Sequence, residues 1–279
     1  MLVHPITTIT MVTAAMATGR PRSGGRLSRA AAGQQPRAAR KRVCASKEAT
    51  PASALASVTL ARLMIWLSPA FPVGAYCFSH GLEWVVEEGI VRDASSLRAW
   101  IAGVLAHGSG RTDVIVLAET WRAVTGGDAP RLARTAELAA ALAPSAERRL
   151  ETLAQGTAFL NAVEAAWSRP LLSRLSASGA DIAYPVAVGA VAAAHGLALP
   201  ATAQAFCQAF AANLVSAGIR LIPLGQTDGV RVLAQLASEI PTLVDEALAA
   251  ELEDVGGAAV AVDIASMRHE TQYTRLFRS

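Results

Sequence analysis

The stretch that decides the fold reads DIAYPVAVGAVAAAHGLALPATAQAFCQAFAANLVSAGIR, residues 181–220, and it has no charged residue between its two ends. Its length would allow two membrane spans around the turn HGLALP. Alanine contributes little transfer energy, however, and Gln204, Gln208 and Asn213 are spread along the run. Burial between the helices of a bundle therefore costs less than exposure to lipid. We predict two central helices of a helical domain; the alternative is a membrane-embedded helical protein built on residues 182–219.

The rest of the chain shares this helical composition. Hydrophobic residues make up 52% of the sequence and aromatic residues only 5%, and alanine is the most frequent residue, a mix that favours helix over sheet. Loops rich in proline and glycine separate segments of helical periodicity. The sequence predicts an all-α fold, a single-domain bundle of about ten helices over residues 54–279. Besides the two central helices, we expect helices at 60–67, 75–88, from caps near 93–96 to 107, 113–124, 129–142, 145–167, 227–238 and 242–252.

The net charge is divided unevenly along the chain. The whole sequence carries +3, but its first 47 residues hold seven arginines, two lysines and no acidic residue, which leaves the remainder at −6. A polyanion binder needs a basic face, so we expect no nucleic-acid partner. Residues 1–53 are predicted to be a disordered basic leader, either an organellar transit peptide or a mis-called start. The predicted localisation is cytoplasmic, or organellar if the leader is a transit peptide.

Motifs for catalysis are absent from the sequence. It contains no GxxxxGK[ST] phosphate loop, no HExxH and no GxSxG. Ser79 precedes His80, but adjacent positions on a helix point about 100° apart, so the two cannot form a nucleophile and base pair. Three widely spaced cysteines, Cys44, Cys77 and Cys207, argue against a disulfide framework and for a reducing compartment. The chain is predicted not to be an enzyme.

Cys77 and His80 are a weak candidate pair for a metal. On a helix over residues 75–88 their i, i+3 spacing would place a thiolate and an imidazole on one face, suited to zinc or nickel. Two ligands do not make a site, and no CxxC or HxH tract supplies the others. We therefore predict no metal site in this chain, with Cys77 in the core and His80 as a capping or hydrogen-bonding residue.

Two loops and the C-terminal segment are suited to contacts with other proteins. In SPAFPVG, residues 68–74, two prolines fix an extended path and Gly74 permits a positive φ. The run RLIPLGQ, which begins at Arg220, repeats this device. The C-terminal segment, residues 255–279, combines arginines with Tyr273 and Phe277, and these are residue types that anchor interfaces. We expect this segment to be either frayed or docked.

Three motifs in these regions resemble the UreF family of urease accessory proteins. The first, SP-x-x-PVG followed by S-x-GLE, is carried by Ser68, Pro69, Pro72, Val73, Gly74, Tyr76, Ser79, Gly81, Leu82 and Glu83. The second, R-x-x-PLGQ-x-x-G, is carried by Arg220, Pro223, Leu224, Gly225, Gln226 and Gly229. The third, H-x-x-x-x-TRLF-x-S, is carried by His269, Thr274, Arg275, Leu276, Phe277 and Ser279. The resemblance covers roughly residues 58–279 and leaves out the leader.

This resemblance implies an all-α adaptor for urease maturation. UreF proteins bind the accessory protein UreD, also called UreH, recruit the nickel-carrying GTPase UreG, and help to deliver nickel to apo-urease. The resemblance also implies a homodimer. No cofactor would be bound tightly by this chain, because nickel would be handled by the complex.

The resemblance also assigns candidate binding residues. The C-terminal segment is implied to bind UreD/UreH, and the loops around 68–74 and 220–226 are implied to lie at dimer or GTPase surfaces. The candidates for partner binding are Arg268, His269, Tyr273, Arg275 and Phe277 in the C-terminal segment, and Arg220, Gln226, Pro72, Gly74 and Tyr76 in and beside the loops.

Overall fold

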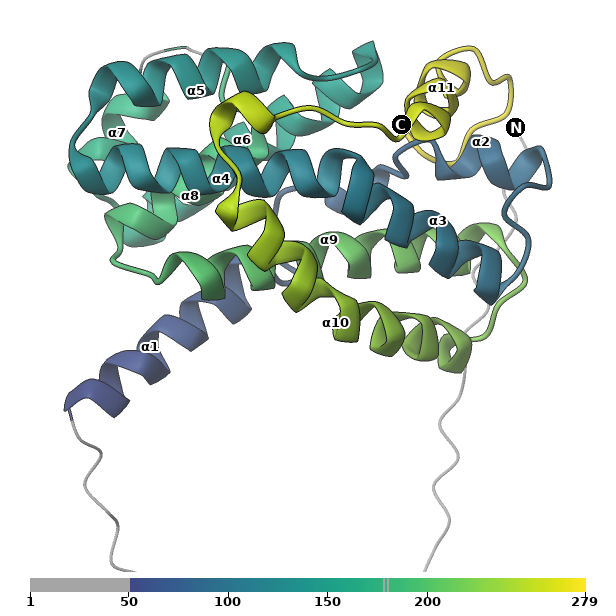
Figure 1. Cartoon of the computed structure of the whole chain (residues 1–279), viewed down its shortest axis with the longest axis horizontal. Coiled ribbons are helices and arrows are strands. Elements are labelled where there is room, and N and C mark those ends of the chain that lie inside the picture. Colours follow the sequence, from purple (N-terminus) through teal and green to yellow (C-terminus); the bar gives the residue numbers. More distant parts are fainter. Residues whose placement is uncertain (1–50, 178, 180) are drawn as a thin grey trace, which may run out of the picture. The chain divides into compact units, whose positions relative to one another are not determined.

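The structure is a computed structural model that describes residues 51–177, 179 and 181–279. Over these residues the chain forms eleven α-helices, two short 3₁₀ helices and no strand (Figure 1). The predicted all-α bundle of about ten helices is confirmed. The leader predicted over residues 1–53 lies outside the described residues except for its last three, which belong to α1.

The helices follow one another with short connections. In chain order they are α1 (Pro51–Trp66), η1 (Ala75–Cys77), α2 (Leu82–Glu87), α3 (Ala94–His107), α4 (Ser109–Gly126), α5 (Ala129–Ala141), α6 (Ala146–Trp167), α7 (Pro170–Ala177), α8 (Tyr184–Ala194), α9 (Leu199–Leu221), α10 (Gln226–Ala249), η2 (Leu252–Asp254) and α11 (Val260–His269). Side-chain caps from Asp93, Asp128 and Ser145 begin α3, α5 and α6. The sequence patterns did not indicate α7 or α11.

The uncharged stretch forms α8 and α9, as predicted, and α8 lies in the core. All residues of α8 from Pro185 to Ala192 are buried, as expected for a helix that is apolar on every side. A Cβ on Gly189 would lie 2.5 Å from the carbonyl oxygen of Leu117, so α8 and α4 approach backbone to backbone. None of the described helices has both the length and the apolarity needed to cross a membrane.

The helix predicted over residues 75–88 is wrong. The chain forms η1, then turns, and α2 begins only at Leu82. In the turn His80 and Gly81 have positive φ values of 58° and 73°. A Cβ on Gly81 would lie 2.7 Å from the backbone nitrogen of Ser266, so close packing of α11 requires glycine here. Cys77 and His80 therefore share no helical face, and the geometric basis of the candidate metal pair is lost.

The prediction of separate helices at 227–238 and 242–252 is also wrong, because α10 runs unbroken through Pro241. Proline lacks the N–H that the helix needs and usually kinks or ends it. The buried residues Leu236, Ile240 and Val244 keep one helical spacing on both sides of Pro241. Packing of this continuous apolar face, mainly on α9, α3 and α4, holds the helix together across the proline.

Candidate functional site

The C-terminal segment packs on the body of the same chain. α11 lies against α2 and α6, and Figure 1 shows it beside α2. The ten residues that follow it, 270–279, are here called the tail. Phe277 is only 4% exposed and Ser279 is fully buried. Of the two expectations, frayed or docked, the structure shows a docked tail.

Glu83 holds the middle of the tail through its carboxylate. It lies in the first turn of α2, directly after the turn that Gly81 allows. The backbone N–H groups of Leu276 and Phe277 donate to its two oxygens at 2.6 and 2.9 Å. Nε2 of His269 lies 3.1 Å from one of the same oxygens. One buried carboxylate therefore fixes both α11 and the tail.

Glu147, in the first turn of α6, is a second carboxylate that holds this segment. Its Oε2 lies 2.6 Å from Nδ1 of His269, and its Oε1 accepts from Arg275 at 2.6 Å. Glu270 completes the contact from the other direction, because its Oε1 accepts the backbone N–H of Ala146 at 2.7 Å. This N–H lies in the first turn of α6, where backbone donors have no partner within the helix. α11 and α6 thus hold each other through charged side chains.

The end of the tail enters a buried polar network. The backbone N–H and the hydroxyl of Ser79 both donate to the backbone oxygen of Ser279. The hydroxyl of Ser279 donates to Glu151 at 2.8 Å. Ser79, Glu83, Glu147 and Glu151 are here called the cradle, because each of them holds α11 or the tail through its side chain.

Glu151 is the centre of the buried network. Arg148 and Gln155 donate to its carboxylate, and Nδ1 of His80 lies 3.1 Å from it. Burial by itself would raise the pKa of Glu151, but Arg148, His80 and Ser279 outweigh this effect and lower the pKa to about 2. Burial and the charge of Arg148 lower the pKa of His80. Nδ1 of His80 also lies 2.7 Å from Nη1 of Arg148.

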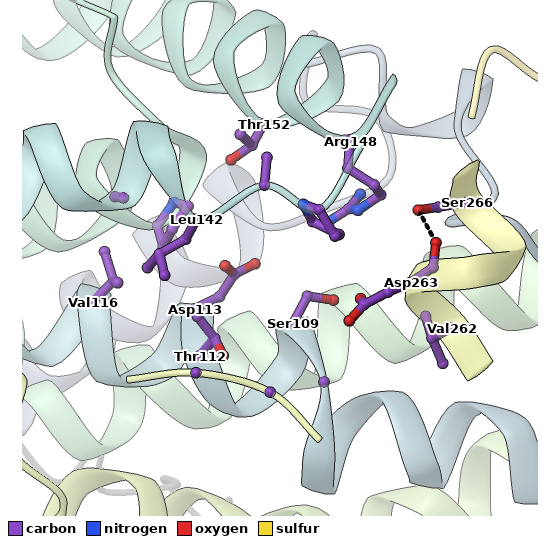
Figure 2. A pocket seen from close by; sticks show the side chains of 17 residues that line it. Ser109, Thr112, Asp113, Val116, Leu142, Arg148, Thr152, Val262, Asp263 and Ser266 are labelled. Carbon is purple, nitrogen blue, oxygen red and sulfur yellow. Dashed lines mark hydrogen bonds between the residues drawn. The ribbon is translucent and has the colours of Figure 1, made fainter. Parts of the chain in front are cut away.

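A small cavity of about 110 Å³ lies beside this network; it is here called the polar cavity, because charged and hydroxyl side chains form part of its otherwise apolar wall. Figure 2 shows Asp113 of α4, Asp263 of α11 and Arg148 of α6 among the side chains around it. Burial raises the pKa of Asp113 to about 7, with Arg148 opposing and Glu151 adding to the shift. Burial also raises the pKa of Asp263. The cavity offers oxygen ligands, but the guanidinium beside them makes it a poor cation site.

Metal ligation finds no support in the part of the chain that the structure describes. No group of three or more His, Cys, Asp or Glu side chains there is arranged to hold an ion. Nδ1 of His80 is already bonded within the buried network, and Cys77 lies in η1. Its backbone oxygen accepts the N–H of Arg278 at 2.8 Å.

The five candidate residues of the C-terminal segment divide into two groups. His269 and Phe277 are buried against the same chain, so in this docked state they present no surface to a partner. Arg268, Tyr273 and Arg275 are exposed, and Tyr273 is fully exposed. The segment therefore has an inner side that holds it to the body and an outer side that faces solvent.

Among the candidate residues in and beside the loops, one contacts the tail and others are exposed. The guanidinium of Arg220 lies 4.3 Å from the ring centroid of Phe277, so this residue joins the tail as a cation–π partner. Gln226 begins α10 and is exposed, and Pro72 and Tyr76 are exposed as well. Gly74 has a φ of 73°, a conformation that glycine permits.

The three motifs that are separated in the sequence meet in space. Ser79 and Glu83 of the first motif bind the tail, which belongs to the third, and Arg220 of the second covers Phe277. Sequence reasoning missed the roles of Glu83, Glu147 and Glu151. Glu83 stands within the first motif, so the motif was the available signal for it. Glu147 and Glu151 lie in a helix where a charged residue is usually on a solvated face, and no pattern distinguished them.

Comparisons with known proteins identify the family of this chain. Residues 91–237 match the UreF family model. A urease accessory protein UreF from Rhodopseudomonas palustris strain HaA2 is 55% identical over 232 residues, which cover 83% of this chain and 98% of the relative. The same protein from Xanthobacter autotrophicus strain Py2 is 52% identical over 225 residues, 80% of this chain and 93% of the relative. The UreF protein from Bradyrhizobium sp. strain BTAi1 is 51% identical over 220 residues, which cover 79% of this chain and 92% of the relative.

These relatives define the class as urease accessory proteins, distinct from urease itself. Within that class, the chain belongs to the UreF family.

Proposed function

We propose that this urease accessory protein is an adaptor that binds UreD/UreH through the outer side of its C-terminal segment, recruits UreG, and so supports nickel insertion into apo-urease. It makes and breaks no bonds itself. Its contribution is contact surface and positioning, for which a rigid helical body is suited.

The observation that carries this proposal is an apolar stripe on α11. Val260, Ile264 and Met267 follow one another at i, i+4 and i+7 on one helical face, and they are 63%, 46% and 49% exposed. Tyr273 and Leu276 of the tail are exposed as well. Exposed apolar groups of this kind mark a protein interface when they lie together on one segment. Arg268 and Arg275 supply charge beside them.

The buried members of the segment have a different role in this proposal. His269 and Phe277 bind the body and hold the outer side in shape. They contribute to partner binding indirectly, by reducing the conformational entropy that the tail would lose on binding.

The test is co-purification of the full chain with UreD/UreH. The variant Ile264→Asp/Tyr273→Ala is expected to lose most of the captured partner while its helical circular dichroism and thermal unfolding stay unchanged. The matched control changes an exposed apolar side chain of α6, Leu150→Asp, and is expected to keep UreD/UreH. Full capture by the first variant would contradict the assignment.

We further propose a homodimer in which α1 contacts a second copy. Val58, Leu60, Met64 and Ile65 of α1 are exposed apolar residues. α1 and α9 border a groove of about 760 Å³ with a largely apolar lining. A second copy is the proposed occupant, because the same apolar helix would be available from each protomer and would cover the face of the other. Sedimentation should show a dimer for the full chain and a monomer for Met64→Asp/Ile65→Ala.

The loops at 68–74 and 220–226 are proposed for the dimer or UreG surface, with Pro72, Gly74, Tyr76 and Gln226 as the contacts. Arg220 is assigned to support of the tail, because it stacks on Phe277. Nickel is proposed as cargo of the assembled complex and not as a resident ion of this chain. The cytoplasm is the proposed compartment, supported by the free thiols of Cys77 and Cys207. The complex of wild-type chain with UreD/UreH is expected to capture UreG. The complex that contains Tyr76→Ala is expected not to capture it.

A further inference from the structure

We infer that His269 is a doubly protonated imidazolium that fastens the C-terminal segment to the body, so that partner binding through this segment depends on one proton. The second clause rests on the proposed function. The first concerns this chain alone and is tested without a partner.

The geometry of the ring favours two protons, because both of its nitrogens face carboxylates. His269 is fully buried, and its two nitrogens face two different carboxylates, Glu147 at 2.6 Å and Glu83 at 3.1 Å. An ionised carboxylate can only accept a hydrogen bond, and a neutral imidazole has a single N–H. A neutral ring would therefore direct one lone pair at an ionised carboxylate in direct contact with it, an arrangement that carries a large cost. Protons on both nitrogens satisfy both contacts.

The charges around the ring balance when it is an imidazolium. The carboxylates of Glu83 and Glu147 are matched by His269 and by Arg275, which binds the second oxygen of Glu147. The neighbouring ionisable groups are engaged elsewhere. On α2, Glu87 accepts from Gln272; on α6, Arg148 binds Glu151; and Glu270, next to His269, accepts from the start of α6. On α11 itself, Asp263 lines the polar cavity and Arg268 is exposed.

Loss of the proton would release more than one bond. Without it, two carboxylates near 10% exposure would share the single charge of Arg275, which is itself 41% exposed. Glu83 also holds the backbone N–H groups of Leu276 and Phe277. The contact that holds the end of α11 and the contact that holds the tail therefore share one carboxylate, so loosening the first weakens the second.

The first experiment observes the ring directly. Long-range ¹H–¹⁵N spectra of full-length chain labelled at histidine should give both ring nitrogens of His269 the protonated shift at pH 7. His269→Gln identifies the signal by its disappearance, and the exposed His107 of α3 serves as an internal reference. A single-tautomer neutral ring, facing a protonated glutamate, would overturn the inference.

The second experiment separates charge from shape by a double-mutant cycle. Hydrogen exchange of residues 270–279 is measured in wild type, His269→Gln, Glu147→Gln and the double variant, with His107→Gln as the matched control. His269→Gln should lower protection of the tail on the order of a hundredfold, because it leaves buried carboxylates without their cation. The double variant should recover part of this loss, since it removes the excess negative charge. Strictly additive effects would overturn the charged state, because a neutral ring offers no such relief.

The third experiment tests whether capture of UreD/UreH depends on the second ring proton of His269. As the pH is raised until the NMR signal shows loss of the second ring proton, protection of the tail and capture of UreD/UreH should fall together. His269→Gln should show neither response. A tail that is released while capture continues would overturn the proton dependence but leave the fastening intact. Absence of capture at every pH, with the tail still responding, would contradict the proposed function and not the imidazolium.

Discussion

Nη1 of Arg148 lies 2.7 Å from Nδ1 of His80 and also donates to Glu151, so the guanidinium, and not the imidazole, is the charged partner of this buried carboxylate. Buried ion pairs are costly to form and more costly to break from one side. Three groups donate to this carboxylate, because Gln155 and Ser279 join Arg148. The buried network therefore couples α6 to the end of the tail.

Acid should destabilise the protein through Glu151. Its pKa is about 2 in the folded chain against an ordinary value of 4.5, so its contribution is present above about pH 4.5 and is lost as the pH falls toward 2. The shift corresponds to about 3 kcal/mol. Urea unfolding between pH 2 and 7 should show this loss in wild type and a smaller one in Glu151→Gln. The exposed Glu137→Gln should retain the wild-type profile, and an unchanged profile in Glu151→Gln would contradict the assignment.

Asp113 should make the protein less stable as the pH rises, which is opposite to the effect of Glu151. Its pKa rises from 3.8 to about 7 on folding, so the folded chain holds a proton that the unfolded chain has released, and stability falls as the pH rises from about 4 to about 7. Asp113→Asn should remove this decline and raise the free energy of unfolding at pH 8 by about 2 kcal/mol. Asp245→Asn, an exposed change on α10, is the control. A variant no more stable than wild type at pH 8 rules out a desolvated carboxylate here.

The turn before α2 should tolerate no side chain at Gly81. Alanine would be strained by the positive φ and would press its Cβ on the backbone of Ser266. We expect Gly81→Ala to cost more than about 3 kcal/mol, since strain and overpacking add. Gly89→Ala is the matched control: its φ is 71°, but no atom lies within 4 Å of the added Cβ, and strain alone costs about 1 kcal/mol. Equal losses in thermal unfolding would show that the contact with α11 is unimportant.

Replacement of the two aromatic residues of the tail should affect the stability of the protein to different extents. Phe277 is buried under Arg220, whereas Tyr273 is fully exposed. Phe277→Ala should lower the free energy of unfolding by about 3 kcal/mol, as for other buried aromatic side chains. Tyr273→Ala should remain within about 0.5 kcal/mol of wild type. Urea unfolding followed by circular dichroism distinguishes the two, and a tail that is detached in solution would give two silent variants.

Much of the fold could be predicted from sequence because local signals determined it. The caps at Asp93 and Ser145 start α3 and α6 where expected, and the alanine-rich uncharged stretch forms α8 and α9. The errors occurred where tertiary contacts outweigh local preference. Pro241 remains inside α10 because an apolar face continues past it, and the segment at 75–88 is interrupted because α11 packs on Gly81.

The candidate site likewise has features that local sequence determined and features that depend on tertiary contacts. The sequence by itself determined that the chain is helical and that it carries the three UreF motifs, because composition, periodicity and local spacing are properties of neighbouring residues. Only the tertiary structure decided that His269 and Phe277 face inward. Their partners, Glu83 and Arg220, lie far from them in the chain, and burial of a charged group is favourable only where such distant partners are brought within hydrogen-bonding or stacking distance.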